Sequence, residues 1–103
     1  MAKNFQEIMA EARKEIPEVT AQQVNDLLTN NGKSHVLLDV RESDEWRQGH
    51  LEGALPLPRG FLEIKVESAI PDKNTPVMAY CAGGVRSLLA AKVMKEMGYQ
   101  NVS

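Results

Sequence analysis

The sequence predicts one α/β domain built on a mostly parallel sheet with helices on both faces. Short apolar runs alternate along the chain with segments that carry apolar residues at helical spacing, the order that parallel sheets require. The run at 35–40 (HVLLDV) is typical of a strand buried on both faces, and the run at 77–80 (VMAY) is expected to form another strand. The chain has 103 residues, 43% of them hydrophobic, which is enough for one core and too few for two domains.

Two helices are expected before the first of these strands. Residues 3–14 place four apolar side chains on one helical face, namely Phe5, Ile8, Met9 and Ala12. A second helix is expected from Ala21 to about Thr29, because Thr20 and Gln23 have the spacing of a capping box. The NNG sequence at 30–32 should end this helix.

The rest of the chain continues the alternation of helices and strands. A short helix is expected over 43–48, closed by Gly49, and then a short edge strand at 54–58, where the prolines exclude a central position. A helix within 60–69 precedes the 77–80 strand. The last helix is expected to run from near Ser87 to a C-cap at Gly98, and the final residues, QNVS, would begin one more strand.

Two of the predicted strands end in residues that carry chemistry, LLDVR at 37–41 and AYC at 79–81. The carboxyl ends of parallel strands meet at one edge of a sheet, and sites form at that edge in open α/β folds. We therefore expect a functional site at the edge that holds Asp39, Arg41 and Cys81.

Cys81, the chain's only cysteine, stands where a strand ends and a loop begins. Gly83 and Gly84 permit a left-handed backbone and leave N–H groups uncovered, so the amides of 82–86 can curl around the sulfur. The dipole of the following helix and the charge of Arg86 act in the same direction, and all three favour a nucleophilic thiolate. An inert, buried cysteine is the alternative, but an inert thiol needs neither bare backbone nor a nearby cation.

Composition argues against several other classes of function. The net charge is −2, with both signs mixed along the chain and few aromatic residues, so no nucleic-acid partner is expected. No apolar run approaches the roughly 20 residues of a membrane-spanning helix, so no membrane partner is expected. A single cysteine cannot form an internal disulfide, and the charged N-terminus lacks the apolar core of a signal peptide, which indicates a cytoplasmic protein.

Two segments resemble the rhodanese family of sulfurtransferases. LLDVRESDEWRQGHLEGALPLP at 37–58 resembles the family's first motif, and YCAGGVRS at 80–87 resembles its active loop. The resemblance implies a three-layer rhodanese-like fold with a mostly parallel central sheet flanked by helices. It places a rhodanese-like domain at 16–103, after an N-terminal amphipathic helix at 1–15, and that domain would lack the family's C-terminal segment.

The resemblance also implies a ping-pong reaction. A catalytic Cys81 thiolate would take the outer sulfur of a small anionic donor such as thiosulfate or a persulfide, and the Cys81 persulfide would pass it to a thiophilic acceptor, either a thiol or an acceptor protein. No metal or other cofactor is implied. Five residues would bind the substrate, namely Ala82, Gly83, Gly84, Val85 and Arg86. Four others would support the loop, namely Asp39, Arg41, Glu45 and His50.

Three alternatives remain open on these residues. Asp39, Arg41, Glu45 and His50 could form an acid/base group, although we expect His50 to be a hydrogen-bonded structural residue. Cell-cycle phosphatases share the fold but place five residues between cysteine and arginine, whereas four separate Cys81 from Arg86. A non-catalytic rhodanese-like binding module usually lacks the cysteine, and this chain keeps it. The sequence leaves the physiological donor and acceptor undetermined.

Overall fold

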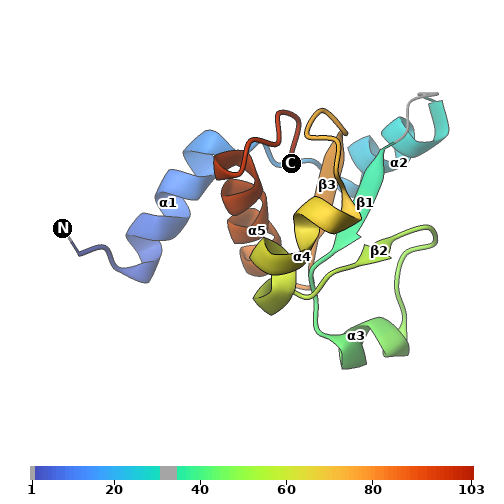
Figure 1. Cartoon of the computed structure of the whole chain (residues 1–103), viewed down its shortest axis with the longest axis horizontal. Helices are drawn as coiled ribbons and strands as arrows, with labels where there is room; N and C mark the ends of the chain where they lie inside the picture. The colour runs from blue at the N-terminus through green and yellow to red at the C-terminus, as the bar shows by residue number, and fades with distance from the viewer. Residues whose placement is uncertain (1, 31–34) are drawn as a thin grey trace.

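The computed structural model of the chain describes residues 2–30 and 35–103. Helices and strands alternate in the order that the sequence predicts (Figure 1). The elements are α1 (Phe5–Glu15), α2 (Ala21–Asn30), β1 (Val36–Asp39), α3 (Ser43–Gln48), β2 (Leu55–Pro56), the 3-10 turn η1 (Arg59–Phe61), α4 (Leu62–Ala69), β3 (Val77–Tyr80) and α5 (Val85–Glu96).

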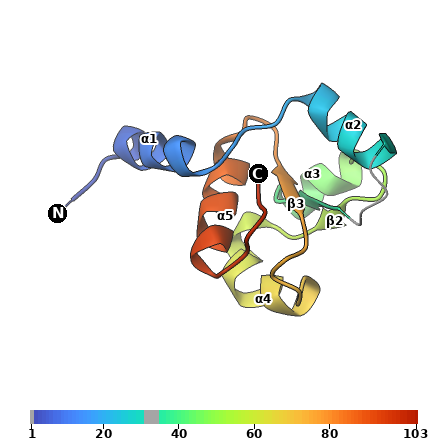
Figure 2. The ribbon, with the colours of Figure 1, turned by 90° about the horizontal axis from the view of Figure 1, so that it is seen from above.

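The central sheet is parallel and has the order β2-β1-β3. Leu38 at its centre lies opposite Leu55 of β2 on one side and Ala79 of β3 on the other. Figure 2 shows α2 and α4 on opposite sides of the sheet, so the predicted layered α/β fold is confirmed. The short proline-containing strand β2 lies at the edge, as expected, because a proline cannot donate a hydrogen bond to a neighbouring strand.

The strand predicted at the last residues is reduced to one bridge. Val102 pairs in parallel with Val77 on the free side of β3. The amide of Ser103 donates to the Val77 carbonyl at 3.0 Å, and the amide of Ala79 donates to the Ser103 carbonyl at 2.9 Å. These bonds continue the sheet past β3 without a full strand.

Local capping explains where the first two helices begin. The Asn4 side chain accepts from the Glu7 amide at 2.9 Å in a capping box at the start of α1. The capping box predicted for α2 is confirmed, since Thr20 Oγ1 accepts from the Gln23 amide at 3.1 Å and Gln23 Oε1 accepts from the Thr20 amide at 2.7 Å. The helix reaches Asn30, and the remainder of the predicted NNG stop lies outside the described residues.

Helix α1 packs beside α5 through only half of its predicted apolar face. Met9 and Ala12 are buried, whereas the side chain of Phe5 is 59% exposed and Ile8 is also exposed. The Nζ atom of Lys95 donates to the carbonyl of Glu15 at 3.2 Å and fixes the end of α1 on α5. The described residues contain no helix with both the length and the apolar character needed to cross a membrane.

The core lies between the sheet and α4 and α5. Tyr99, just after α5, is buried and its hydroxyl donates to the carbonyls of Ile70 at 2.5 Å and Val66 at 3.3 Å. The largest apolar side chains that are almost completely buried are Leu38, Val40, Leu62, Val66, Val77 and Met94. This core holds the carboxyl ends of β1 and β3 in fixed register, and those ends carry the residues discussed next.

Candidate active site

The carboxyl ends of β1 and β3 lie side by side, as the sequence predicts. Asp39, the last residue of β1, is paired in register with Tyr80, the last residue of β3. Cys81 follows directly, and α5 begins four residues later at Val85. The loop between β3 and α5 therefore opens at the same edge of the sheet as the end of β1 (Figure 1).

The Cys81 sulfur lies inside this loop and accepts hydrogen bonds from two amides. The amide of Gly84 donates to Sγ at 3.0 Å and the amide of Ser87 at 3.4 Å. The Ser87 Oγ atom lies 3.5 Å from the same sulfur. Cys81 is half-buried, and it lines an open hollow together with Arg41 and Tyr80.

These hydrogen bonds make the thiol more acidic. Burial raises the pKa of Cys81, but the hydrogen bond with the Ser87 hydroxyl and those from the amides of Ser87, Gly84 and Gly83 outweigh burial and hold the pKa below its ordinary value. A larger fraction of the sulfur is therefore thiolate at neutral pH than in an unperturbed cysteine, and the thiolate is the nucleophilic form.

Only one of the two loop glycines adopts a left-handed backbone. Gly84 has φ of +86° and is the N-cap of α5, whereas Gly83 does not have a positive φ. Because the chain turns at Gly84, α5 begins at Val85, two residues before the predicted start near Ser87. The Ser87 amide thus lies in the first turn of the helix, where N–H groups have no partner within the helix and are free to bind the sulfur.

Arg86 is directed toward α3 rather than bonded to the sulfur. Its two terminal nitrogens donate to the carboxylate of Glu45 at 2.6 and 3.1 Å. The hydrogen bond from Arg86 lowers the pKa of Glu45 to about 2, so this pair persists at any physiological pH. The structure thus brings two predicted site residues together, in an arrangement that ties the loop to α3.

A buried carboxylate organises the other side of the loop. Asp39 is 1% exposed and accepts from Arg41 Nε at 3.0 Å, from the second Arg41 nitrogen at 2.8 Å and from the Tyr80 hydroxyl at 2.7 Å. Arg41 also donates to the carbonyl of Gly49 at 2.7 Å, and Tyr80 accepts from the Leu51 amide at 3.2 Å. This network joins β1, β3 and the segment after α3 immediately beside Cys81.

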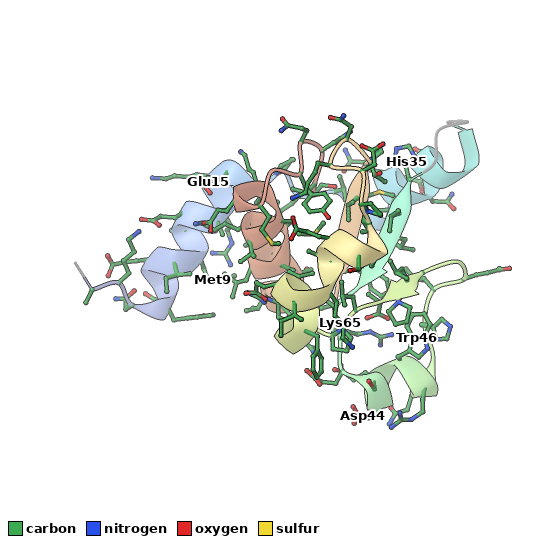
Figure 3. The ribbon with its side chains drawn as sticks, viewed as in Figure 1. Met9, Glu15, His35, Asp44, Trp46 and Lys65 are labelled. Carbon is green, nitrogen blue, oxygen red and sulfur yellow. The ribbon has the colours of Figure 1, made fainter. Side chains whose placement is uncertain are left out.

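His50 is held by Trp46. The two rings stack in parallel with centroids 3.4 Å apart, and His50 Nδ1 lies 2.9 Å from the Trp46 carbonyl oxygen. In Figure 3, Trp46 projects from α3 toward β2. His50 also lines an open hollow of about 290 Å³ with Arg41, Leu51, Tyr80, Cys81 and Ala82.

The structure places all ten predicted site residues around this loop or in the segments bonded to it. Sequence reasoning missed two further residues, Ser87 and Tyr80. Ser87 could have been found from its place in the first turn of the helix after the cysteine, where a hydroxyl and an amide both point back at the loop. Tyr80 carried no such signal, because its bond to Asp39 spans 41 positions of the chain.

The fold and the site indicate a class of α/β proteins. In this class a cysteine stands in an amide-lined loop at the carboxyl edge of a parallel sheet and presents its thiolate to an anion. Within that class, the chain belongs to the family of the rhodanese-like domain, whose family model matches residues 20–103. Both motifs singled out in the sequence lie inside the matched region.

Two curated relatives illustrate the range of that family. The thiosulfate sulfurtransferase PspE of Escherichia coli is 37% identical over 65 residues, which cover 63% of this chain and 62% of PspE. The tRNA uridine(34) hydroxylase of Chlamydia pneumoniae is 34% identical over 95 residues, which cover 86% of this chain but 29% of that protein. The matched region thus spans 62% of the length of PspE and 29% of that of the hydroxylase, less than two thirds of either relative.

Solved structures agree with the fold. A Rhodopseudomonas palustris protein of unknown function, RPA3614, described as a possible tyrosine phosphatase, superposes with a TM-score of 0.87 at 27% identity, over 99% of this chain and 83% of that one. An Escherichia coli rhodanese solved with anions superposes with a TM-score of 0.64 at 35% identity, over 67% of this chain and 81% of that one.

Ser87 and Arg86 are expected to differ in how strongly they acidify Cys81. Ser87→Ala removes a hydroxyl next to the sulfur, whereas Arg86→Ala removes a cation whose charge Glu45 already neutralises. Both changes should raise the pKa of Cys81, with the larger shift in Ser87→Ala. The measurement is the rate of iodoacetamide alkylation against pH. A larger shift in Arg86→Ala would show that its charge, rather than the hydrogen bonds, sets the acidity.

The two loop glycines provide a matched pair of substitutions. Gly84→Ala forces a Cβ onto a left-handed backbone, at a cost of roughly 1–2 kcal/mol, and should displace the amide that donates to Sγ. Gly83→Ala meets no atom within 4 Å and no positive φ, so its effect on stability should be below about 0.5 kcal/mol. Urea unfolding and cysteine alkylation on both variants check this, and equal effects would contradict it.

Proposed function

We propose that the protein is a sulfurtransferase that moves sulfane sulfur through a persulfide on Cys81. The observation that carries the proposal is the set of hydrogen-bond donors around Sγ, since donors aimed at a half-buried thiolate also suit the anionic outer sulfur of a persulfide. The thiosulfate sulfurtransferase PspE among the relatives supports the same reaction class. The donor would be thiosulfate or a persulfide.

The proposed reaction has two displacement steps. In the first, the Cys81 thiolate attacks the outer sulfur of thiosulfate; the new sulfur–sulfur bond forms as the bond within thiosulfate breaks, and sulfite leaves with that electron pair. In the second, an acceptor such as cyanide attacks the outer sulfur, and Cys81 leaves as a thiolate while thiocyanate forms. Neither step requires a metal or another cofactor, so a chelator should leave the rate unchanged.

A phosphatase is the competing function, because RPA3614 is described as a possible tyrosine phosphatase. The length of the loop favours sulfur transfer. Only four residues separate Cys81 from Arg86, and the Gly84 amide approaches to 3.0 Å of the sulfur itself. A loop closed this tightly around one sulfur atom offers less room for the three oxygens of a phosphoryl group than the five-residue loop of the phosphatases.

Intact-mass measurement tests the proposal. After treatment with thiosulfate, the protein should gain the mass of one sulfur atom, and cyanide should remove it with release of thiocyanate. Cys81→Ser, treated in parallel, should gain nothing. A wild-type protein that gains no sulfur from thiosulfate or from a persulfide donor would contradict the proposal. Hydrolysis of p-nitrophenyl phosphate by the wild type but not by Cys81→Ser would favour the phosphatase.

A further inference from the structure

The hollow that Cys81 lines offers little uncompensated positive charge. Within the part of the chain that the structure describes, Arg41 is the only lysine or arginine that lines it. The Arg41 guanidinium donates to the buried carboxylate of Asp39 at 3.0 and 2.8 Å and to the Gly49 carbonyl at 2.7 Å. The negative charge of Asp39 therefore balances the charge of Arg41.

Arg86, at the start of α5, is a cation near the sulfur whose charge is also compensated. Its two terminal nitrogens donate to different oxygens of the Glu45 carboxylate, at 2.6 and 3.1 Å. The hydrogen bond with Glu45 raises the pKa of Arg86, and the nearby charges of Cys81 and Glu42 act in the same direction. Arg86 thus lies within electrostatic reach of the sulfur, but Glu45 cancels its charge.

Charge matters in the first step of the proposed reaction because the nucleophile is an anion. Thiosulfate carries two negative charges, so its transition state gathers three of them with the Cys81 thiolate. An organic thiosulfonate has a carbon in place of one sulfonate oxygen and carries one charge, so its transition state gathers two. The amides of Gly84 and Ser87 can donate to the reacting sulfur with either donor. A net positive charge nearby would favour thiosulfate, because electrostatic attraction grows with the charge of the donor.

The other walls of the hollow suit an organic group on the donor. Leu51, Tyr80 and Ala82 line it beside Cys81, and Leu51 is 50% exposed. An alkyl or aryl group placed against these side chains would remove apolar surface from water, which is favourable. A sulfonate oxygen at the same place would have no such gain.

We infer that Glu45 is a specificity-determining residue, which favours singly charged organic donors over doubly charged thiosulfate by compensating Arg86. The inference rests on the proposed sulfur transfer. With an organic thiosulfonate, the Cys81 thiolate attacks the outer sulfur, and the new sulfur–sulfur bond forms as the bond within the donor breaks. A sulfinate leaves with that electron pair. One negative charge stays on the persulfide, and the other departs with the sulfinate.

Glu45→Gln and Arg86→Gln should shift donor preference in opposite directions. The measured quantity is the second-order rate constant for persulfide formation with methanethiosulfonate, divided by that with thiosulfate. Glu45→Gln leaves Arg86 with a net charge and should lower this ratio about three- to tenfold relative to the wild type. Arg86→Gln leaves Glu45 uncompensated and should raise it by a similar factor. A wild-type ratio in Glu45→Gln, or a shift in the same direction in both variants, would overturn the inference.

Two controls and the choice of glutamine separate charge from structure. Glutamine is close to glutamate in size and keeps an oxygen for Arg86 and for the Glu42 amide, from which Glu45 accepts at 3.0 Å. Asp44→Asn removes the neighbouring exposed carboxylate and should leave the ratio within about 1.5-fold of the wild type. At about 1 M salt, where the Debye length is about 3 Å, the shift in Glu45→Gln should shrink. A shift that Asp44→Asn matches, or that salt leaves unchanged, would contradict a role for the charge of Glu45.

Donor preference can also be tested without sulfur transfer. Sulfate and methanesulfonate carry the same charges as the two donors but have no sulfane sulfur. Each anion is tested for protection of Cys81 from iodoacetamide, and Glu45→Gln should strengthen protection by sulfate relative to methanesulfonate by about threefold or more. An unchanged relative protection would count against the inference.

Failure of this inference is distinguishable from failure of the proposed function. If neither donor adds sulfur to Cys81 of the wild type, the proposed function is wrong, and the protection measurements still report on Glu45. If both donors add sulfur but the ratio does not move in Glu45→Gln, sulfur transfer stands and the role assigned to Glu45 is wrong.

Discussion

Replacing Cys81 with serine should abolish sulfur transfer from thiosulfate to cyanide. A serine hydroxyl is not ionised near neutral pH and cannot hold sulfane sulfur in a persulfide, so the covalent step has no substitute. The expected rate is that of the uncatalysed mixture. The assay is thiocyanate formation at saturating thiosulfate, with the wild type at equal folded concentration.

The same substitution should leave the fold nearly unchanged. Cys81 is half-buried and serine is close to it in size, so the free energy of unfolding should change by less than about 1 kcal/mol. Urea unfolding measures this change. Turnover by a folded Cys81→Ser protein would show that another group carries the sulfur. Cys81→Ala is the second variant, because it also removes the hydroxyl that could bind a donor.

Elements with strong local signals could be predicted from the sequence. The strand at 77–80 and the helix at 43–48 have the bounds that the sequence predicts. A continuous apolar run marks the strand and a glycine marks the end of the helix, and both signals come from neighbouring residues. The capping box of α2 was correct for the same reason, since both partners lie within one helical turn.

Features that depend on distant contacts could not be predicted. The face of α1 was read as one apolar stripe, but only the part that meets α5 is buried, and Phe5 stays exposed. Arg86 and Glu45 are 41 positions apart, so their pairing is invisible to any local pattern. The sequence suggested that the charge of Arg86 acts on the sulfur. In the structure that charge is bonded to Glu45, and the hydrogen-bond partners of the sulfur are amides and the Ser87 hydroxyl.

The two ionic pairs on either side of Cys81 differ in how they stabilise the protein. The Arg86–Glu45 pair is about one-third exposed on both sides, so solvent screens it and it acts mainly by orienting the loop. The Arg41–Asp39 pair contains a carboxylate that is almost completely buried. Breaking a buried pair leaves the other charge without a partner, which is far more costly than breaking an exposed one. The larger loss of stability is therefore expected at Asp39.

Asp39→Asn should lower the free energy of unfolding by about 3–5 kcal/mol at pH 7, because Arg41 and Tyr80 would lose the carboxylate that binds them. Burial raises the pKa of Asp39, but the hydrogen bonds from Arg41 and Tyr80 outweigh burial and hold the pKa below its ordinary value. A lowered pKa means that the stabilisation is present above the pKa of the unfolded chain, roughly 3.9, and is lost as the pH falls through the folded value. The difference in stability between wild type and Asp39→Asn should thus shrink below about pH 4.

Urea unfolding at pH 7 and pH 3 measures this difference. Asp26→Asn, at an exposed carboxylate of α2, is the control and should change stability by less than about 0.5 kcal/mol at either pH. Tyr80→Phe removes one hydrogen bond from the same carboxylate and should lower the free energy of unfolding by about 1 kcal/mol, which keeps the test decisive if Asp39→Asn does not fold.

An Asp39→Asn protein as stable as the wild type at pH 7, or a Tyr80→Phe protein with no loss of stability, would show that the Asp39 network does not hold the two strand ends together. Loss of stability in Tyr80→Phe with unchanged alkylation of Cys81 would place the network in the fold alone, whereas slower alkylation would extend it to the geometry of the loop.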